Sequence, residues 1–99
     1  MIDYYDKEGN AMTLEEWGEK LEDSEYKVVA QKELPNEKWI STVWLGLNHG
    51  FGDGGPPLIF ETMVFPKKGE YGELDMDRYS TLEEAEAGHK KMVEEWTNK

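Results

Sequence analysis

The chain has 99 residues, of which 22 are acidic and 11 are basic, so its formal net charge is −11. It contains no cysteine, which excludes disulfide bonds and thiolate metal sites and is compatible with a reducing cytoplasm. The acidic residues are spread over both halves of the sequence, and an evenly acidic surface repels nucleic acid and anionic membranes.

The length fits one domain, residues 1–99. No apolar run approaches the roughly 20 residues that a membrane-spanning helix needs, and the first residues lack the basic and apolar regions of a signal peptide. We therefore expect a cytoplasmic protein with no membrane partner and no direct binding to nucleic acid. The charge suits either simple solubility or contact with a basic protein surface, including one that normally holds nucleic acid.

The N-terminal part is predicted to form a short strand or hairpin and then a helix. Residues 1–12 combine strand-forming side chains with a glycine–asparagine turn signal. Thr13 and Glu16 fit a capping box, in which each side chain accepts the backbone N–H of the other residue. Apolar residues then recur at helical spacing, which indicates a helix over 14–22 with one apolar face. These residues are Leu14, Trp17 and Leu21.

The middle of the chain is predicted to be a run of strands. Alternating, β-branched and aromatic residues indicate strands over 26–33, 39–45, 58–65 and 74–79. A loop that contains five glycines, residues 46–57, joins the second and third of these strands. We expect the two strands around this loop to form a long-looped hairpin at the centre of the fold.

The last segment is predicted to form a helix over 81–97. Ser80 with Glu83 fits a second capping box, and acidic residues crowd the first turns, where they suit the helix dipole. One face is apolar and includes a histidine: Leu82, Ala85, His89, Met92, Val93 and Trp96. The order of elements predicts a single α+β domain, an antiparallel sheet of four to five strands with two helices packed on one face.

Short segments along nearly the whole chain form a recognisable pattern. In the first third they are Tyr4-Tyr5-Asp6, Gly9-Asn10, Met12-Thr13-Leu14, Glu16-Trp17, Tyr26-Lys27 and Val29-Ala30. In the middle they are Ser41-Thr42-Val43-Trp44-Leu45-Gly46-Leu47, His49, Phe51-Gly52, Gly55-Pro56-Pro57 and Ile59-Phe60-Glu61-Thr62-Met63-Val64-Phe65. Near the end they are Tyr79-Ser80-Thr81, Glu84-Ala85, Gly88-His89 and Met92-Val93.

With these segments the sequence resembles a family of small, functionally uncharacterised proteins of actinobacterial and bacteriophage genomes. The resemblance implies a phage or prophage origin rather than a particular activity. Similar proteins commonly have aspartate where this chain has Asn48, so a role that needs a carboxylate at that position is in question.

Seven residues are candidates for a binding site: Trp44, Asn48, His49, Phe51, Asp53, Glu61 and His89. Four of them lie in the glycine-rich loop, where glycine permits close approach to a ligand and histidine acts as acid, base or ligand near neutral pH. The alternative is a long hairpin loop in which Phe51 only fills the core. The loop is not a phosphate-binding loop, because no Gly-Lys-Ser/Thr follows and a strand comes next.

Glu61 stands in an apolar strand and allows two interpretations. If Ile59, Met63 and Phe65 face the core, Glu61 is buried there and needs a partner or a raised pKa. If Phe60 and Val64 face inward instead, Glu61 lies on the solvent face. The second interpretation is favoured, because carboxylates are rarely fully buried.

His89 lies on the apolar stripe of the last helix, where a lone histidine is more often a satisfied boundary residue than a ligand. If Glu61 also faces that helix, the two side chains form a pair, and with His49 and Asp53 they make up the candidate acid–base or metal set. Trp44 and Phe51 are candidates for an exposed hydrophobic patch that contacts a protein partner or a second copy of the chain.

The favoured hypothesis is a non-enzymatic interaction protein of phage type that acts on a host or phage protein, with no catalytic residue, metal or cofactor. The alternatives are a small-ligand or metal-assisted binder or hydrolase built on His49, Asp53, Glu61 and His89, and an acidic mimic of nucleic acid.

Overall fold

The computed structural model describes residues 4–48 and 55–99 and has an α+β fold. Its elements follow in the order β1 (Tyr4–Tyr5), β2 (Ala11–Met12), α1 (Leu14–Glu22), α2 (Ser24–Lys27), β3 (Val28–Glu33), β4 (Trp39–Trp44), β5 (Phe60–Phe65), β6 (Asp75–Tyr79) and α3 (Leu82–Thr97). The predicted fold class is confirmed. For the last three strands, the observed and predicted ends differ by at most two residues.

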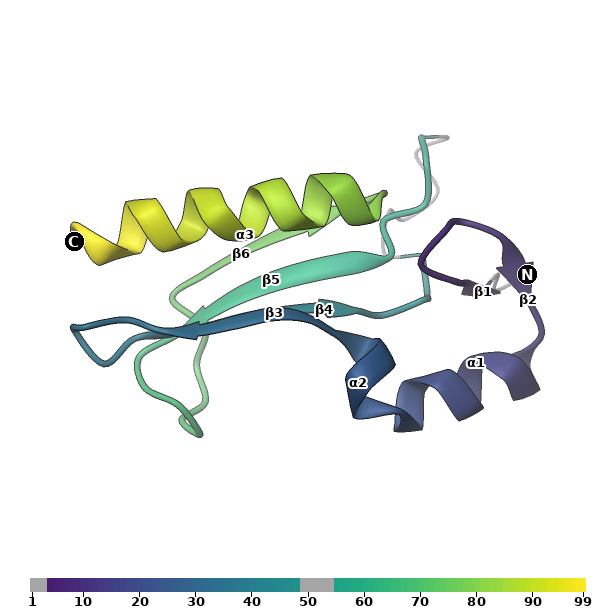
Figure 1. Ribbon diagram of the computed structural model, residues 1–99, viewed down its shortest axis with the longest axis horizontal. Coiled ribbons are helices and arrows are strands. Elements are labelled where there is room, and N and C mark those ends of the chain that lie inside the picture. Colours follow the sequence, from purple (N-terminus) through teal and green to yellow (C-terminus); the bar gives the residue numbers. More distant parts are fainter. Residues whose placement is uncertain (1–3, 49–54) are drawn as a thin grey trace.

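Four strands form an antiparallel sheet in the order β3-β4-β5-β6, so each strand lies beside its neighbour in the sequence (Figure 1). β4 and β5 pair over their whole lengths, from Trp39 opposite Phe65 to Trp44 opposite Phe60. The predicted hairpin in the middle of the chain is therefore present, and its two strands are the central strands of the sheet.

The long helix α3 lies along one face of this sheet and contacts all four strands (Figure 1). Successive side chains of a strand point to opposite faces, and the alternate positions on the α3 side carry the core. Six central side chains are fully buried there: Ile40, Thr42 and Trp44 of β4, and Phe60, Thr62 and Val64 of β5. Ala85 and Met92 complete the core from the helix.

The β1–β2 hairpin and α1 lie at one end of the sheet (Figure 1). Trp17 of α1 packs on the ring of Tyr4 with 4.7 Å between ring centroids, and its indole N–H donates to the backbone oxygen of Leu45 at 2.9 Å. Through Trp17 and Leu21, α1 reaches the same hydrophobic cluster that α3 helps to close. The short helix thus depends on docking for much of its stability, as its central glycine, Gly18, suggests.

The predicted capping box of α1 is confirmed, with both Thr13–Glu16 bonds present. The capping box of α3 lies one residue later than predicted, at Thr81 and Glu84 rather than at Ser80 and Glu83. Both registers match the sequence pattern, but in the observed one Glu84 accepts the backbone N–H groups of Ser80 and Thr81 together. That additional bond favours the later start.

The prediction of a strand from residue 26 onward is wrong for its first two residues. Ser24–Lys27 form the one-turn helix α2, because the side chain of Asp23 accepts the backbone N–H groups of Glu25 and Tyr26. The strand β3 begins at Val28, and its pairing with β4 shifts between Val28 and Ala30, which marks a β-bulge. The bulge changes which side chains of β3 face α3.

Candidate functional site

A chain of polar side chains lies buried between α3 and the sheet. His89 projects from α3, and its Nδ1 atom is 2.8 Å from Oγ1 of Thr42 on β4. The Thr42 oxygen is in turn 2.6 Å from Oγ1 of Thr62 on β5. An unpaired buried polar group costs about 1–3 kcal/mol, so these bonds fix the position of α3 over the two central strands.

His89 lies on the buried face of α3, as its helical spacing with the apolar residues of this segment predicts, and 8% of the residue is exposed. Burial lowers the pKa of His89 below the ordinary value of 6.5. The ring is therefore neutral at pH 7, with one nitrogen as donor and the other as acceptor. The Thr42 hydroxyl takes the role that complements the tautomer present.

Tyr79 of β6 adds a polar atom without a hydrogen bond to this buried layer. Its hydroxyl makes no hydrogen bond to any of the residues that the structure describes. Burial raises the pKa of Tyr79, and the nearby Thr62 hydroxyl offsets part of that rise without reaching hydrogen-bond geometry. The ring of Tyr79 packs directly against Gly88 of α3, where a Cβ atom would overlap it.

Glu61 lies on the opposite face of the sheet from His89. It directly precedes Thr62 on β5, and Thr62 belongs to the buried chain beneath α3, so alternation directs Glu61 away from the helix. The condition for a pair between Glu61 and His89, that both face the helix, is therefore not met. The favoured interpretation was right that Phe60 and Val64 face inward, but Glu61 is not solvated.

Glu61 is 7% exposed, and its Oε2 atom accepts a hydrogen bond from Nε of Arg78 on β6 at 3.1 Å. The two residues stand directly opposite each other in the β5–β6 register. An ionised carboxylate removed from water needs such a partner, so Arg78 is what permits Glu61 within an apolar surface.

The expectation that Trp44 forms an exposed patch is wrong, because Trp44 is fully buried. Its indole N–H donates to the backbone oxygen of Tyr5 at 2.9 Å, and the ring of Tyr26 meets it edge-on at 5.0 Å between centroids. Trp44 therefore joins the N-terminal hairpin and α2 to the core of the sheet.

Asn48 is exposed, and its side-chain oxygen accepts the backbone N–H of Leu58 at 2.9 Å. This bond joins the two ends of the glycine-rich loop, and it requires an oxygen acceptor rather than a negative charge. The remaining candidates His49, Phe51 and Asp53 lie outside the described residues.

The side of the sheet that faces away from α3 is a distinct surface, which we call the open face. Directly paired residues of antiparallel strands point to the same side, so the register defines its members. On β4, β5 and β6 they are Trp39, Ser41, Val43, Glu61, Met63, Phe65, Met76 and Arg78, and on the edge strand β3 they are Val28, Gln31 and Glu33. Met76 is 40% exposed, and the other apolar members are partly exposed. Figure 1 shows α3 on the other side of the sheet, with α1 and α2 at one end.

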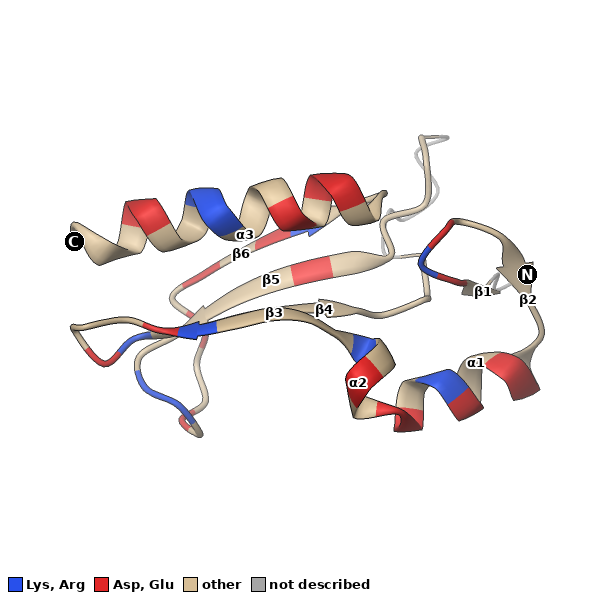
Figure 2. Ribbon diagram, viewed as in Figure 1, with Lys and Arg blue, Asp and Glu red and all other residues tan. Residues whose placement is uncertain are grey.

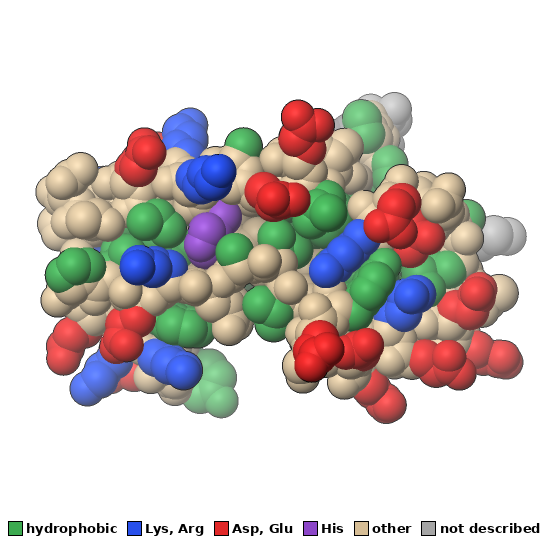
Figure 3. Space-filling view, viewed as in Figure 1, with side chains coloured by type: hydrophobic (Ala, Val, Ile, Leu, Met, Phe, Trp, Pro, Cys, Tyr) green, Lys and Arg blue, Asp and Glu red, His purple; other side chains and the backbone are tan. Residues whose placement is uncertain are grey.

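Two grooves run along α3, one beside each edge strand. The basic groove, of about 270 Å³ beside β3, is lined by Gln31, Lys32, His89, Lys90, Val93 and Glu94. The acidic groove, of about 210 Å³ beside β6, is lined by Asp75, Met76, Asp77, Gly88, Lys91, Met92 and Glu95. Figure 2 shows acidic residues along α1, α3 and β6, so the basic groove stands out from the general charge. Figure 3 shows histidine and basic side chains together at the surface between α3 and β3.

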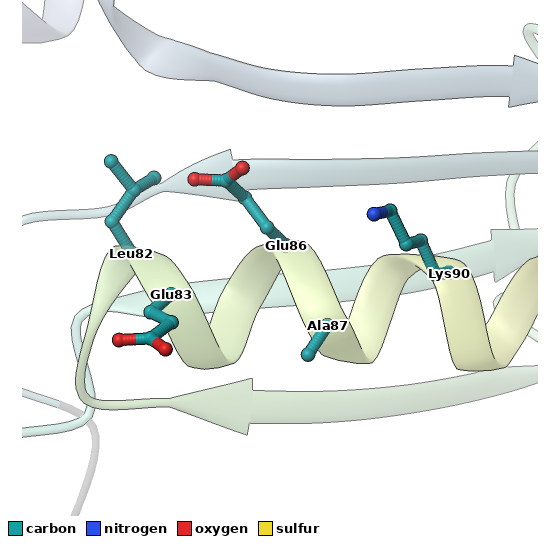
Figure 4. Close-up of a pocket in the computed structure, with 5 residues that line it drawn as sticks. All are labelled: Leu82, Glu83, Glu86, Ala87 and Lys90. Atoms are coloured by element: carbon teal, nitrogen blue, oxygen red, sulfur yellow. The ribbon is translucent and has the colours of Figure 1, made fainter.

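A third hollow, of about 560 Å³, lies on the outside of α3 (Figure 4). Leu82, Glu86 and Lys90 project to one side of the helix, whereas Glu83 and Ala87 project to the other. All five lining residues belong to this one helix, so no second element closes the hollow around a ligand.

Neither metal chemistry nor a known relative assigns a function to this geometry. Among residues 4–48 and 55–99, no three His, Cys, Asp or Glu side chains come together as a metal site would require. Within the same residues, no helix has the length and apolar character needed to cross a membrane. Comparison of the chain with protein-family models, with curated proteins and with solved structures finds no match.

Sequence reasoning missed the partners of the two titratable candidates. Arg78 is the one arginine in the chain and stands in the strand next to Glu61, so a β5–β6 register would have paired them. Thr42 and Thr62 each lie two positions from a large apolar residue on either side, so each threonine shares the core face of its strand. A polar residue on a core face with period two is the signal that predicts a buried hydrogen-bonded pair.

Proposed function

We propose that the protein is a small acidic interaction protein of phage type, without catalytic activity, which binds a host or phage protein through the open face. One observation supports this proposal above others: the sheet carries large apolar side chains on both sides. An antiparallel sheet with a single covering layer usually has a polar outer face. Contiguous apolar surface that remains exposed is typical of a binding site.

The composition of the open face suits an interface. Trp39 and Phe65 lie directly opposite each other, and Met63 lies opposite Met76 on the next strand. Aromatic residues and methionine are enriched in the cores of protein interfaces, and methionine adapts its shape to a partner. On β5 and β6 the charged members Glu61 and Arg78 neutralise each other, so covering this part of the open face leaves no buried charge without a counterion.

The charge of the whole chain favours a different protein over a second copy as the partner. Two copies, each with a net charge of −11, would repel each other on approach. A partner with an apolar patch inside a basic rim would instead be attracted toward the sheet. A homodimer through the open face is the alternative, and a measurement of molecular mass separates the two.

The experiment places the photo-crosslinking amino acid p-benzoylphenylalanine at Met63 on the open face, and at Glu86 on the outer side of α3 as the matched control. Position 63 should capture a defined protein in the cells that express the chain, and position 86 should not. The purified partner should then bind Met63→Arg about tenfold more weakly than the parent chain, and Glu86→Arg with unchanged affinity.

Three outcomes would overturn the proposal. One is capture only at position 86, and another is equal affinity of Met63→Arg and the parent chain. The third is a crosslink between two copies together with a dimeric mass in light scattering, which would make the open face a self-association surface. Far-UV circular dichroism of each variant confirms that the fold is retained.

A further inference from the structure

We infer that the basic groove is a second docking site, which receives an extended acidic peptide segment of a partner protein as a strand added to β3. This site is separate from the open face and does not depend on it. Four observations support the inference. Within the part of the chain that the structure describes, the outward backbone groups of β3 are unpaired, whereas the N–H groups of β6 are bonded to aspartate side chains. The groove beside β3 carries two lysines, and these lysines would repel those of a second copy.

The backbone of β3 has an unpaired side. The Leu34 N–H donates to the Lys38 oxygen at 2.8 Å, and in an antiparallel ladder the backbone groups facing the partner strand belong to alternate residues. Residues 30, 32 and 34 therefore face β4, whereas the N–H and C=O groups of Gln31 and Glu33 point away from it. No described strand pairs with this side of β3. Such an edge is a template for an incoming strand.

The opposite edge of the sheet is protected. On β6 the carboxylates of Asp75 and Asp77 accept the N–H groups of Met76 and Arg78, both at 2.9 Å. These donors are therefore occupied, and the acidic groove lies alongside them. No side chain in the described part of the chain accepts the N–H of Gln31 or Glu33. The two edges differ, and β3 is the accessible one.

The charge of the basic groove determines which strand fits. Lys32 stands opposite Ile40 in the register, so its side chain points to the α3 side, and Lys90 lines the groove from the helix. Glu94 is the one acidic residue among the lining side chains. His89 and Val93 line the same groove and offer a less polar contact. An added strand with an acidic side chain toward α3 would place it in the groove that the two lysines line.

The same charge disfavours a second copy as the occupant. If two β3 strands paired antiparallel through their free edges with Gln31 of one copy opposite Glu33 of the other, the two Lys32 residues would stand directly opposite each other. Like charges at adjacent positions of a sheet are destabilising, whereas opposite charges contribute favourably. An acidic segment from another protein is therefore the occupant that the groove selects.

The probe is a fluorescein-labelled short peptide of alternating threonine and valine with glutamate at its centre, titrated into the full-length, ¹⁵N-labelled chain. Binding should shift the amide signals of Gln31 and Glu33 and the ring signals of His89. The same peptide with lysine at its centre should bind about tenfold more weakly. Methylation of alternate peptide nitrogens, which removes the donors to β3, should abolish binding.

Two double charge reversals provide the matched pair. The variant Lys32→Glu with Lys90→Glu should bind the glutamate peptide at least about tenfold more weakly. The control, Lys67→Glu with Lys91→Glu, makes the same change in net charge outside the basic groove and should bind as the parent chain does. Met63→Arg should also bind normally, so failure of the open-face proposal and failure of this one are distinguishable.

The inference is overturned if the glutamate peptide does not bind at millimolar concentration, or if its shifts lie away from β3. It is also overturned if both double reversals weaken binding equally, which would indicate general attraction to charge. Concentration-dependent shifts at Gln31 and Glu33 without peptide would show that a second copy occupies the edge, and would overturn it as well.

Discussion

Two glycines inside helices give a test of how α3 lies on the sheet. In Gly18 of α1, an added Cβ atom meets nothing within 4 Å, whereas in Gly88 of α3 it overlaps the ring of Tyr79. Alanine is better than glycine in a helix by about 1 kcal/mol, so Gly18→Ala should raise the free energy of unfolding by up to that amount. Gly88→Ala gains the same propensity but overpacks a buried contact.

The overpacking decides the sign at Gly88. Inserting a methyl group into a well-packed core costs about 1–3 kcal/mol, and Tyr79 has little room to move because it is 9% exposed between β6 and α3. We expect Gly88→Ala to lower the free energy of unfolding by about 1 kcal/mol after the propensity gain is subtracted. Urea unfolding followed by tryptophan fluorescence measures both variants, which should share the slope of the parent chain.

A double-mutant cycle assigns the effect to the contact. With Tyr79→Leu in place, the ring that a Cβ at position 88 would meet is gone, so Gly88→Ala should cost less there than in the parent chain. The reasoning fails if Gly88→Ala stabilises the protein as much as Gly18→Ala does. In that event α3 does not rest on Tyr79 as described.

Three further predictions concern the buried titratable groups and the start of the glycine-rich loop. Burial lowers the pKa of His89 in the folded state below the value of 6.5 in the unfolded chain, so the unfolded chain binds more protons below pH 6.5. The free energy of unfolding should therefore fall as the pH drops below 6.5, and the contribution of neutral His89 should be fully present above that pH. Urea unfolding at pH 7.5 and pH 5.5 should show a smaller difference for His89→Gln than for the parent chain. Arg78→Met leaves Glu61 buried without its counterion and should cost about 1–3 kcal/mol in thermal unfolding, most of which the double variant with Glu61→Met should recover. Gly46→Ala should cost at least about 2 kcal/mol, because Gly46 has a φ of +72° and a Cβ atom there would lie 2.7 Å from Cδ1 of Trp17; unchanged near-ultraviolet circular dichroism together with unchanged stability would contradict this.

The parts of the fold that depend on local chemistry were predictable from the sequence. The capping box at Thr13 and the spacing of Trp17 and Leu21 predicted α1 with its observed bounds, because both signals act within one or two helical turns. The middle hairpin was predictable in the same way from its β-branched and aromatic residues. The start of α3 shows the limit of such local signals. Both Ser80 and Thr81 fit the pattern of an N-cap, and only the hydrogen bonds of the folded chain select Thr81.

The candidate site was less predictable, because it depends on which face of β5 meets α3. Glu61 and Thr62 differ by one position, and a shift of one residue exchanges every side chain between the two faces. Large apolar residues stand on both sides of this strand, so the pattern alone does not fix the face. The start of β3 was missed for a different reason, because Asp23 caps the one-turn helix α2 over residues 24–27, which strand-forming side chains such as Tyr26 do not reveal.

The ambiguity of β5 and the proposed function have the same physical origin. A strand with one buried face normally reveals that face by alternation, whereas β5 places Phe60, Thr62 and Val64 under α3 and Met63 and Phe65 on the open face. Full burial of a side chain such as phenylalanine or methionine is worth about 1.5–3 kcal/mol, and the isolated chain leaves part of this gain unrealised. A partner that covers the open face would realise it. The feature that makes the strand hard to interpret from sequence is therefore the one that an interaction protein requires.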